Sequence, residues 1–117
     1  MTTVMIVDDS AFARSNLKRT LTGAGYDIFE VSSGQDAVNV ASKVLPDVVT
    51  LDLLMPGLSG LETLKALKST LPNTKYVIIT ADVQNLTREE LLREGAHAFL
   101  NKPFSEAVLL ETIHNLI

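Results

Sequence analysis

The stretch PDVVTLDLLMPGLSGLE, residues 46–62, contains a short apolar run that ends in an acid. Residues 48–51 have the composition of a buried β-strand, and Asp52 follows them directly. A Pro-Gly turn comes next, followed by Ser59 and Glu62 at the spacing of a helix N-terminal capping box. The stretch therefore predicts a strand, a turn and a helix, with Asp52 at the point where the strand ends.

The same strand-and-helix unit recurs along the chain. Short apolar runs, most of them rich in Val and Ile, alternate with longer segments whose apolar residues recur at helical spacing. Five such units predict an α/β fold: a doubly wound, five-stranded parallel sheet in the order 2-1-3-4-5, flanked by five helices. The predicted strands cover residues 4–7, 27–31, 48–51, 76–79 and 98–100. The predicted helices cover residues 11–22, 35–44 and 61–71, a segment that begins near Arg88 after a capping box of Thr87 and Glu90, and residues 105–117.

Length and composition limit the function classes to which the chain can belong. Its 117 residues are enough for one domain with a core, so we expect a single domain over residues 1–117. An excess of acidic residues, 14 against 10 basic ones, without a basic stripe argues against nucleic-acid binding. The lack of cysteine excludes disulfides, thiolate metal sites and a cysteine nucleophile. No apolar run has the length of a signal peptide or a membrane span, so we expect no membrane insertion and a cytoplasmic location.

Polar side chains follow four of the five predicted strands. The carboxyl ends of parallel strands share one edge of the sheet, and binding sites lie at that edge where the strand order reverses, here between the first and third strands. Neighbouring strands lie about 4.8 Å apart, so acids at these two strand ends reach a single ion. The residues at the four strand ends are Asp8 with Asp9, Asp52, Thr80, and Asn101 with Lys102.

The three acids in this set indicate a divalent cation. Carboxylates so close together repel one another, and a cation between them removes the conflict. Oxygen ligands favour Mg²⁺, which binds through one or two carboxylates together with water and phosphate oxygens. Taken singly, each residue has an ordinary interpretation: an acidic pair is typical of turns, Thr80 of strands, Lys102 of solvated surface and Asn101 of a strand end. Acid, hydroxyl and cation together at one edge favour a binding site.

Four segments carry a resemblance to a known family: VMIVDDS (residues 4–10), PDVVTLDLLMPGLSGLE (46–62), VIITA (77–81) and GAHAFLNKPF (95–104). They resemble the motifs of response-regulator receiver domains of the single-domain, CheY-like kind. The resemblance covers residues 3–117 and implies a flavodoxin-like fold and a role in two-component signal transduction. It implies that Asp52 accepts a phosphoryl group from a sensor histidine kinase or a phosphotransfer protein. The chain would then be a phosphoacceptor switch, which assists its own phosphorylation and dephosphorylation, and not an enzyme.

The resemblance also implies a metal site. Asp8 and Asp9 would hold Mg²⁺ together with Asp52 and the backbone carbonyl of Leu54. The position of Leu54, two residues after the acceptor, often carries a polar side chain in the family, and Asp82 occupies the other neighbouring position. An apolar side chain cannot orient hydrolytic water. We therefore expect the phosphoryl group to persist longer than it would with Asn at position 54.

The remaining site residues are assigned by the same resemblance. Lys102 would pair with a phosphoryl oxygen, aimed inward by a cis peptide at the Lys102–Pro103 bond. Thr80 would read the phosphoryl group, and an aromatic residue, here Phe99, would move inward behind it. Without the family, Phe99 would be interpreted as an ordinary core aromatic.

Because the chain ends with its last helix, we expect it to act by binding. The resemblance assigns a downstream protein to the face formed by the fourth helix, fifth strand and fifth helix; chemotaxis as the pathway and a homodimer stay open. A first alternative is a Mg²⁺-dependent phosphatase or phosphotransferase with an aspartyl-phosphate intermediate. Such enzymes usually need a general acid two residues after the nucleophile, where Leu54 cannot serve. A second alternative is a module that binds partners without phosphorylation, against which the intact residue set argues.

His97 and His114 lack metal-ligand spacing, so both are expected to be structural or solvated.

Overall fold

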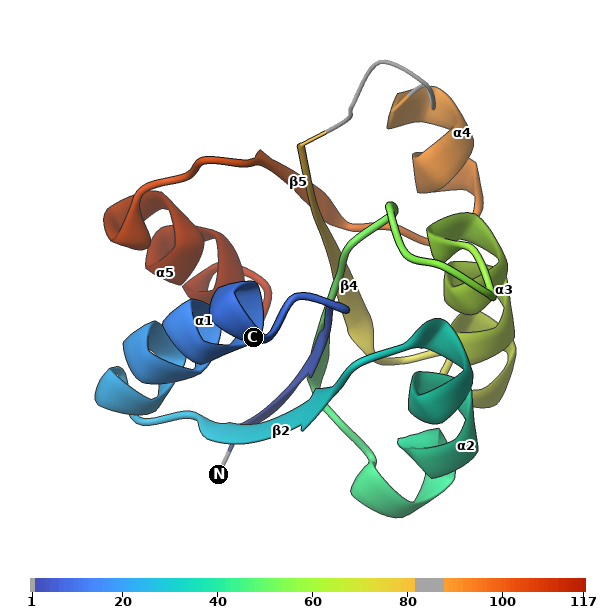
Figure 1. Ribbon diagram of the computed structural model, residues 1–117, viewed down its shortest axis with the longest axis horizontal. Coiled ribbons are helices and arrows are strands. Elements are labelled where there is room, and N and C mark those ends of the chain that lie inside the picture. Colours follow the sequence, from blue (N-terminus) through green and yellow to red (C-terminus); the bar gives the residue numbers. More distant parts are fainter. Residues whose placement is uncertain (1, 82–87) are drawn as a thin grey trace.

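The computed structural model describes residues 2–81 and 88–117 and consists of a central parallel sheet between two layers of helices (Figure 1). The strand order is β2-β1-β3-β4-β5, and every neighbouring pair is parallel. This confirms the predicted doubly wound α/β fold and its strand order. The order in which strands are added to the sheet reverses between β1 and β3, and the acidic residues Asp8 and Asp52 follow these two strands.

The strands and helices of the described residues agree closely with the predicted ranges. The strands are β1 (Thr3–Val7), β2 (Asp27–Val31), β3 (Val48–Leu51), β4 (Lys75–Thr80) and β5 (Ala98–Asn101). The helices are α1 (Ala11–Gly23), α2 (Gly34–Val44), α3 (Gly60–Thr70), α4 (Arg88–Arg93) and α5 (Glu106–His114). None of these helices is long and apolar enough to cross a membrane.

Most boundaries differ from the predicted ranges by no more than one residue, and three differences concern the strand ends at the site and the last helix. Thr80 and Asn101, predicted to follow their strands, are the last residues of β4 and β5 because they pair with each other across the sheet. Helix α5 ends at His114, before the predicted end at residue 117.

The predicted capping box of Ser59 and Glu62 is present at the start of α3. Thr87, the proposed cap of α4, lies outside the described residues, as does Asp82.

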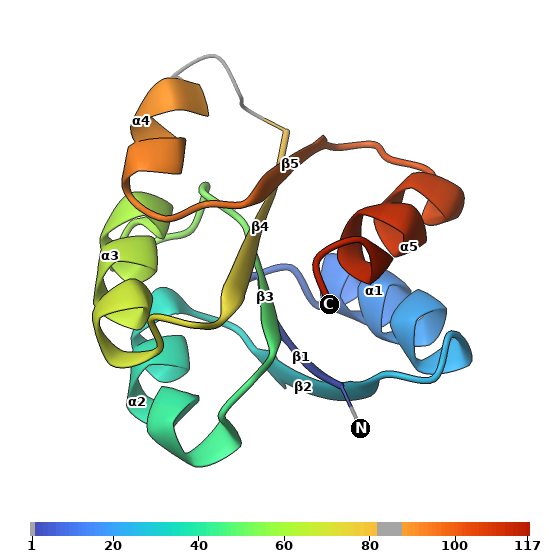
Figure 2. The same cartoon turned by 180° about the vertical axis from the view of Figure 1, so that it is seen from behind.

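Alternation along the strands divides the core into two layers. Helices α1 and α5 cover one face of the sheet, and α2, α3 and α4 cover the other (Figures 1 and 2). Met5 and Val7 of β1 pack toward the α2–α3–α4 side, whereas Val4 and Ile6 pack toward the α1–α5 side. Strands β1, β3 and β4 are therefore buried on both faces, apart from Thr3 and Lys75 at their starts. Strand β2 is an edge strand and only half buried.

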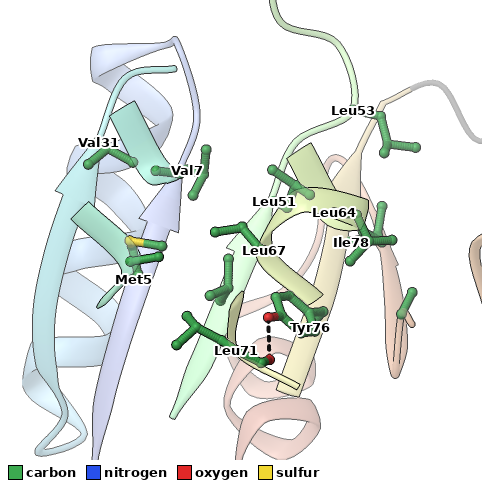
Figure 3. Close-up of a cluster of buried hydrophobic side chains, with 14 of the residues drawn as sticks. Met5, Val7, Val31, Leu51, Leu53, Leu64, Leu67, Leu71, Tyr76 and Ile78 are labelled. Carbon is green, nitrogen blue, oxygen red and sulfur yellow. Dashed lines mark hydrogen bonds between the residues drawn. The ribbon is translucent and has the colours of Figure 1, made fainter. Parts of the chain in front are cut away.

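Tyr76 and His97 stabilise the end of the sheet that lies opposite the carboxyl ends of the strands. The Tyr76 hydroxyl donates to the carbonyl oxygen of Leu71 over 2.8 Å (Figure 3). Nδ1 of His97 accepts the backbone N–H of Tyr76 over 3.0 Å, and the backbone N–H of His97 donates to the Tyr76 carbonyl oxygen over 2.8 Å. His97 thus extends the pairing of β4 with β5 by one residue, which confirms a structural role.

Helices α2 and α3 pack closely against each other at Gly34. A methyl group on this residue would overlap the Thr63 hydroxyl and lie 3.2 Å from the carbonyl oxygen of Leu58. The Thr63 hydroxyl is fully buried and donates to the carbonyl oxygen of Ser59 over 2.8 Å, so it cannot rotate away without losing that bond. Only glycine fits at this contact.

We expect Gly34→Ala to lower the free energy of unfolding by about 1–3 kcal/mol, because the added methyl group overpacks the contact between α2 and α3. Urea denaturation measures the change. Removal of the opposing hydroxyl in a Gly34→Ala/Thr63→Ala double variant should recover part of the loss, so that the two substitutions together cost less than the sum of the single ones. Gly23→Ala, where an added methyl group meets nothing within 4 Å, is the matched control and should be neutral or stabilising. Additive losses at positions 34 and 63 would contradict the packing argument.

His97 should make the fold sensitive to mild acid. Burial, followed by the charges of Lys68 and Lys75, lowers the pKa of His97 below its usual value. Nδ1 of His97 must also be unprotonated to accept the Tyr76 N–H. This contribution to stability is complete above pH about 6.5 and is lost as the pH falls through the lowered pKa of the folded state.

We expect His97→Asn to lose less stability than the wild type between pH 7.5 and pH 5, since asparagine keeps an acceptor near Nδ1 but cannot be protonated. The difference should be below about 1 kcal/mol, because the ring is partly exposed and solvent screens the lysine charges. Urea denaturation at the two pH values measures it. Equal losses in both proteins would show that His97 does not carry this pH dependence.

Candidate functional site

The carboxyl ends of β1 and β3 bring three acids together. Val7 and Leu51 are directly paired, so the residues that follow them, Asp8 and Asp52, lie side by side. The N–H of Asp52 donates to the Val7 carbonyl oxygen over 3.1 Å, which fixes its backbone against β1. Carboxylate oxygens of Asp8, Asp9 and Asp52 lie within 4.8 Å of one another. Asp8 is 2% exposed and Asp52 7%, whereas Asp9 faces solvent. The predicted acidic cluster is therefore formed, and it is open on the side of Asp9.

Lys102 joins two of these acids. Its Nζ lies 2.8 Å from Oδ2 of Asp8 and 2.9 Å from Oδ2 of Asp52. The Lys102–Pro103 peptide is cis, as the family resemblance implies, and the Lys102 N–H donates to the carbonyl oxygen of Thr80 over 3.0 Å. Partial burial alone would lower the pKa of Lys102, but its hydrogen bonds and charge interactions with Asp8 and Asp52 outweigh burial and raise that pKa above its usual value. The site therefore contains a permanent cation that compensates part of the acidic charge.

Backbone amides hold the other oxygen of each buried acid. Oδ1 of Asp8 accepts the N–H of Ser10 over 2.9 Å, and Oδ1 of Asp52 accepts the N–H of Leu54 over 3.0 Å. Each carboxylate is thus oriented by an amide on one oxygen and by an ammonium group on the other. Charge-assisted bonds of this kind are stronger than neutral ones, so both acids are held in fixed directions.

The turn after Asp52 is packed closely against the start of α3. A methyl group on Gly60 would lie 3.0 Å from the carbonyl oxygen of Asp52 and still closer to the backbone of Leu53. Gly60 therefore lets the helix approach the strand end that carries Asp52, a role that the sequence pattern did not reveal. Leu54, between them in the sequence, is 53% exposed.

Thr80 and Phe99 lie on the face of the sheet that α3 and α4 cover. Thr80 is fully buried at the end of β4, and Phe99 of β5 pairs with Ile78, two residues before Thr80 and on the same face. Phe99 is partly buried against the core, with the guanidinium carbon of Arg88 5.6 Å from its ring centroid. This contact with α4 was not predicted, and it distinguishes Phe99 from an ordinary core aromatic. Asn101 is the exposed end of β5, as expected.

Arg14 of α1 is a further residue beside the site that sequence reasoning missed. Its Nη1 donates to the backbone carbonyl oxygen of Asp8 over 2.8 Å. The available signal was its position on the first turn of a helix that follows an acidic pair. On the same side of the sheet, a surface hollow of about 390 Å³ lies between α1 and the start of α5, next to Lys102, and exposed Phe12 forms part of its wall.

Comparisons with known proteins agree with this arrangement. Residues 4–114 match the model of the response regulator receiver domain family. The chain is 35% identical over 114 residues to the chemotaxis protein CheY of Thermotoga maritima, in an alignment that covers 97% of this chain and 95% of that protein.

Two solved structures have nearly the same fold. The chemotaxis protein CheY4 of Vibrio cholerae has a TM-score of 0.93 at 32% identity, with 100% of this chain and 99% of that chain covered. A chain of the CheX-CheY-BeF3-Mg complex from Borrelia burgdorferi has a TM-score of 0.93 at 29% identity, with 98% and 88% covered. The chain therefore belongs to the CheY-like receiver domains of two-component response regulators.

Proposed function

We propose that this receiver domain is a Mg²⁺-dependent phosphoacceptor. It takes a phosphoryl group from a histidine kinase or a phosphotransfer protein onto Asp52 and thereby changes its binding to a downstream protein. The observation that carries the proposal is the position of Asp52, which shares the Lys102 ammonium group with Asp8 and lies beside the exposed Asp9. A nucleophilic carboxylate, a cation for phosphoryl oxygens and further oxygen ligands are thus available at one point.

The donor atoms fit magnesium. Three carboxylates within reach of one another form an all-oxygen set, and the open side at Asp9 leaves room for the waters that Mg²⁺ retains. Asp8, Asp9 and Asp52 would hold the ion, with the backbone carbonyl of Leu54 as a further ligand by family resemblance. When bound, the metal supplies charge neutralisation for phosphoryl oxygens. The Mg²⁺-BeF3 complex of the Borrelia burgdorferi relative supports this choice of ion.

The residues of the chain account for the transfer itself. A lone pair of the Asp52 carboxylate forms the new O–P bond, and the electrons of the P–N bond leave with the imidazole of the donor phosphohistidine. Phosphoryl transfer needs alignment and charge stabilisation more than proton movement. The Leu54 N–H orients the carboxylate, and Lys102, kept protonated by its raised pKa, moves from the carboxylate to a phosphoryl oxygen. The hollow beside Lys102 supports the approach of a phosphodonor protein from the α1 side.

Thr80 and Phe99 would report the new group. Charge-assisted hydrogen bonds from Thr80 and Lys102 to the phosphoryl group contribute about 1.5 to 3 kcal/mol each. Their sum of roughly 3 to 6 kcal/mol is close to the ~5.5 kcal/mol that moves a two-state equilibrium from 1:99 to 99:1. Movement of Phe99 away from Arg88 would then change the face formed by α4, β5 and α5.

A downstream protein on this face, a chemotaxis pathway and a cytoplasmic location are parts of the proposal. The relationship to chemotaxis proteins and the complex of a relative with CheX support the first two. The proposal leaves open whether a second copy of this chain is also a partner.

A phosphatase that forms an aspartyl-phosphate intermediate has less support. The side chain of Leu54 has no proton to donate to a leaving group, although it lies where such an enzyme would need a general acid. A module that binds partners without phosphorylation would have no need for an acceptor acid, two metal-binding acids and a lysine arranged at one edge. The proposed switch accounts for all of these residues.

Asp52→Asn should abolish labelling by radioactive acetyl phosphate in the presence of Mg²⁺, because an amide oxygen is a poor nucleophile. The wild type should take up about one phosphoryl group per chain and none in excess EDTA. Asp36→Asn, at an exposed acid of α2, is the matched control and should be labelled like the wild type. Stoichiometric labelling of Asp52→Asn would overturn the acceptor assignment, and sustained turnover of a generic phosphate ester by the wild type would favour the enzyme instead.

Leu54→Asn should shorten the lifetime of the phosphorylated protein by about tenfold, equal to ~1.4 kcal/mol of barrier, because the amide side chain can orient an attacking water. Loss of label from the two purified phosphoproteins measures the lifetimes. Leu45→Asn changes another exposed leucine at the opposite end of the sheet, in a left-handed conformation that asparagine tolerates, and should leave the lifetime unchanged. Equal half-lives for Leu54→Asn and the wild type would eliminate a role for position 54.

A further inference from the structure

Arg14 holds the peptide group that joins two of the acids. Its Nη1 donates to the carbonyl oxygen of Asp8 over 2.8 Å, and that oxygen belongs to the peptide between Asp8 and Asp9. The orientation of this peptide determines where the Asp9 side chain leaves the backbone. Arg14 of α1 therefore fixes the peptide group that precedes Asp9.

Arg14 is itself held in place by the neighbouring edge strand. Its Nε donates to Oε1 of Glu30 on β2 over 3.1 Å, and the Arg14 side chain is only 18% exposed. Oε2 of Glu30 lies 3.4 Å from Nζ of Lys18, one turn further along α1. The planar guanidinium group presents its N–H groups in fixed directions, so its bond to Glu30 also sets the direction of its bond to Asp8.

The two acids of the pair are constrained to different degrees. Every polar group of Asp8 has a partner: its N–H bonds to Val31, its carbonyl oxygen to Arg14, and its carboxylate oxygens to Ser10 and Lys102. Asp9 is exposed, so its position depends on the peptide that precedes it. If that peptide could rotate, a bound cation would have to order it, at a cost in binding free energy.

We propose that Arg14, oriented by Glu30, is a positioning residue of the magnesium site, which sets the direction of Asp9 through the Asp8–Asp9 peptide. This inference rests on the proposed function, because it assumes that the acids bind Mg²⁺. The change in Mg²⁺ affinity that we expect when Arg14 is removed is opposite in sign to the change that electrostatics alone predicts. Arg14 is a cation near a cation site, so removal of its charge alone would strengthen Mg²⁺ binding, whereas loss of positioning weakens it.

Titration calorimetry of the intact chain with MgCl₂ tests the proposal. Arg14→Met should weaken Mg²⁺ binding about tenfold, in the range found for residues that orient metal ligands. Lys18→Met is the matched control: it removes the same charge from the same helix and also breaks a contact with Glu30, but it leaves Asp8 untouched. Its Mg²⁺ affinity should equal that of the wild type or exceed it slightly.

A second variant separates charge from geometry. Arg14→Lys keeps the positive charge, but one ammonium group cannot reproduce the fixed fork between Asp8 and Glu30, so we expect binding to be several-fold weaker here too. Thermal unfolding in EDTA verifies that each variant is folded, and Arg14→Lys carries the test if Arg14→Met is not. Mg²⁺ affinities of the folded Arg14 variants equal to that of Lys18→Met would overturn the positioning role. A wild type without Mg²⁺ binding would instead contradict the proposed function, and the inference with it.

Discussion

The ion pair of Lys102 with both Asp8 and Asp52 is the contact on which the rest of the site depends. It joins the end of β5 to the ends of β1 and β3, across the width of the sheet, at a place where acids alone would repel. Because the ammonium group compensates only part of the acidic charge, the site stays suited to a divalent cation. The same ammonium group is the natural partner of an incoming phosphoryl group. One side chain therefore stabilises the resting arrangement and takes part in the reaction proposed for it.

Parallel strands make this arrangement possible because their carboxyl ends all lie at one edge. The site residues come from positions separated by up to ninety-four residues, as in the bond of Lys102 to Asp8. Asp8, Asp52 and Lys102 are each held by a backbone hydrogen bond to a neighbouring strand, in which their N–H groups donate to the carbonyl oxygens of Val31, Val7 and Thr80. The apolar layers on the two faces fix the strands, and the strands in turn fix the site.

The sequence was sufficient to predict which residues lie at the strand ends, but not which hydrogen bonds and ion pairs they form. Asp8, Asp52 and Thr80 were predictable because short apolar runs, turns and caps are local patterns, and a parallel sheet then brings their ends together. The contacts of Arg14 with Asp8, and the close approach of Gly60 to Asp52, depend on how side chains from separate elements meet. Lys102 was assigned a phosphoryl partner, and the structure adds its bond to Asp8. The end of α5 was not predictable from periodicity, because apolar residues continue beyond His114, where Asn115 caps the helix.

The position of β5 at the border of the sheet has a mechanical consequence. A border strand is held by one ladder of hydrogen bonds instead of two, so a small slide of β5 disturbs only its pairing with β4. Within four consecutive residues this segment carries both Phe99 and Lys102. A displacement of Lys102 would be transmitted along this short piece of backbone to the partly buried ring of Phe99. Strand β5 would then transmit a displacement from the acidic site to the face proposed to bind a partner, without any rearrangement of the inner strands.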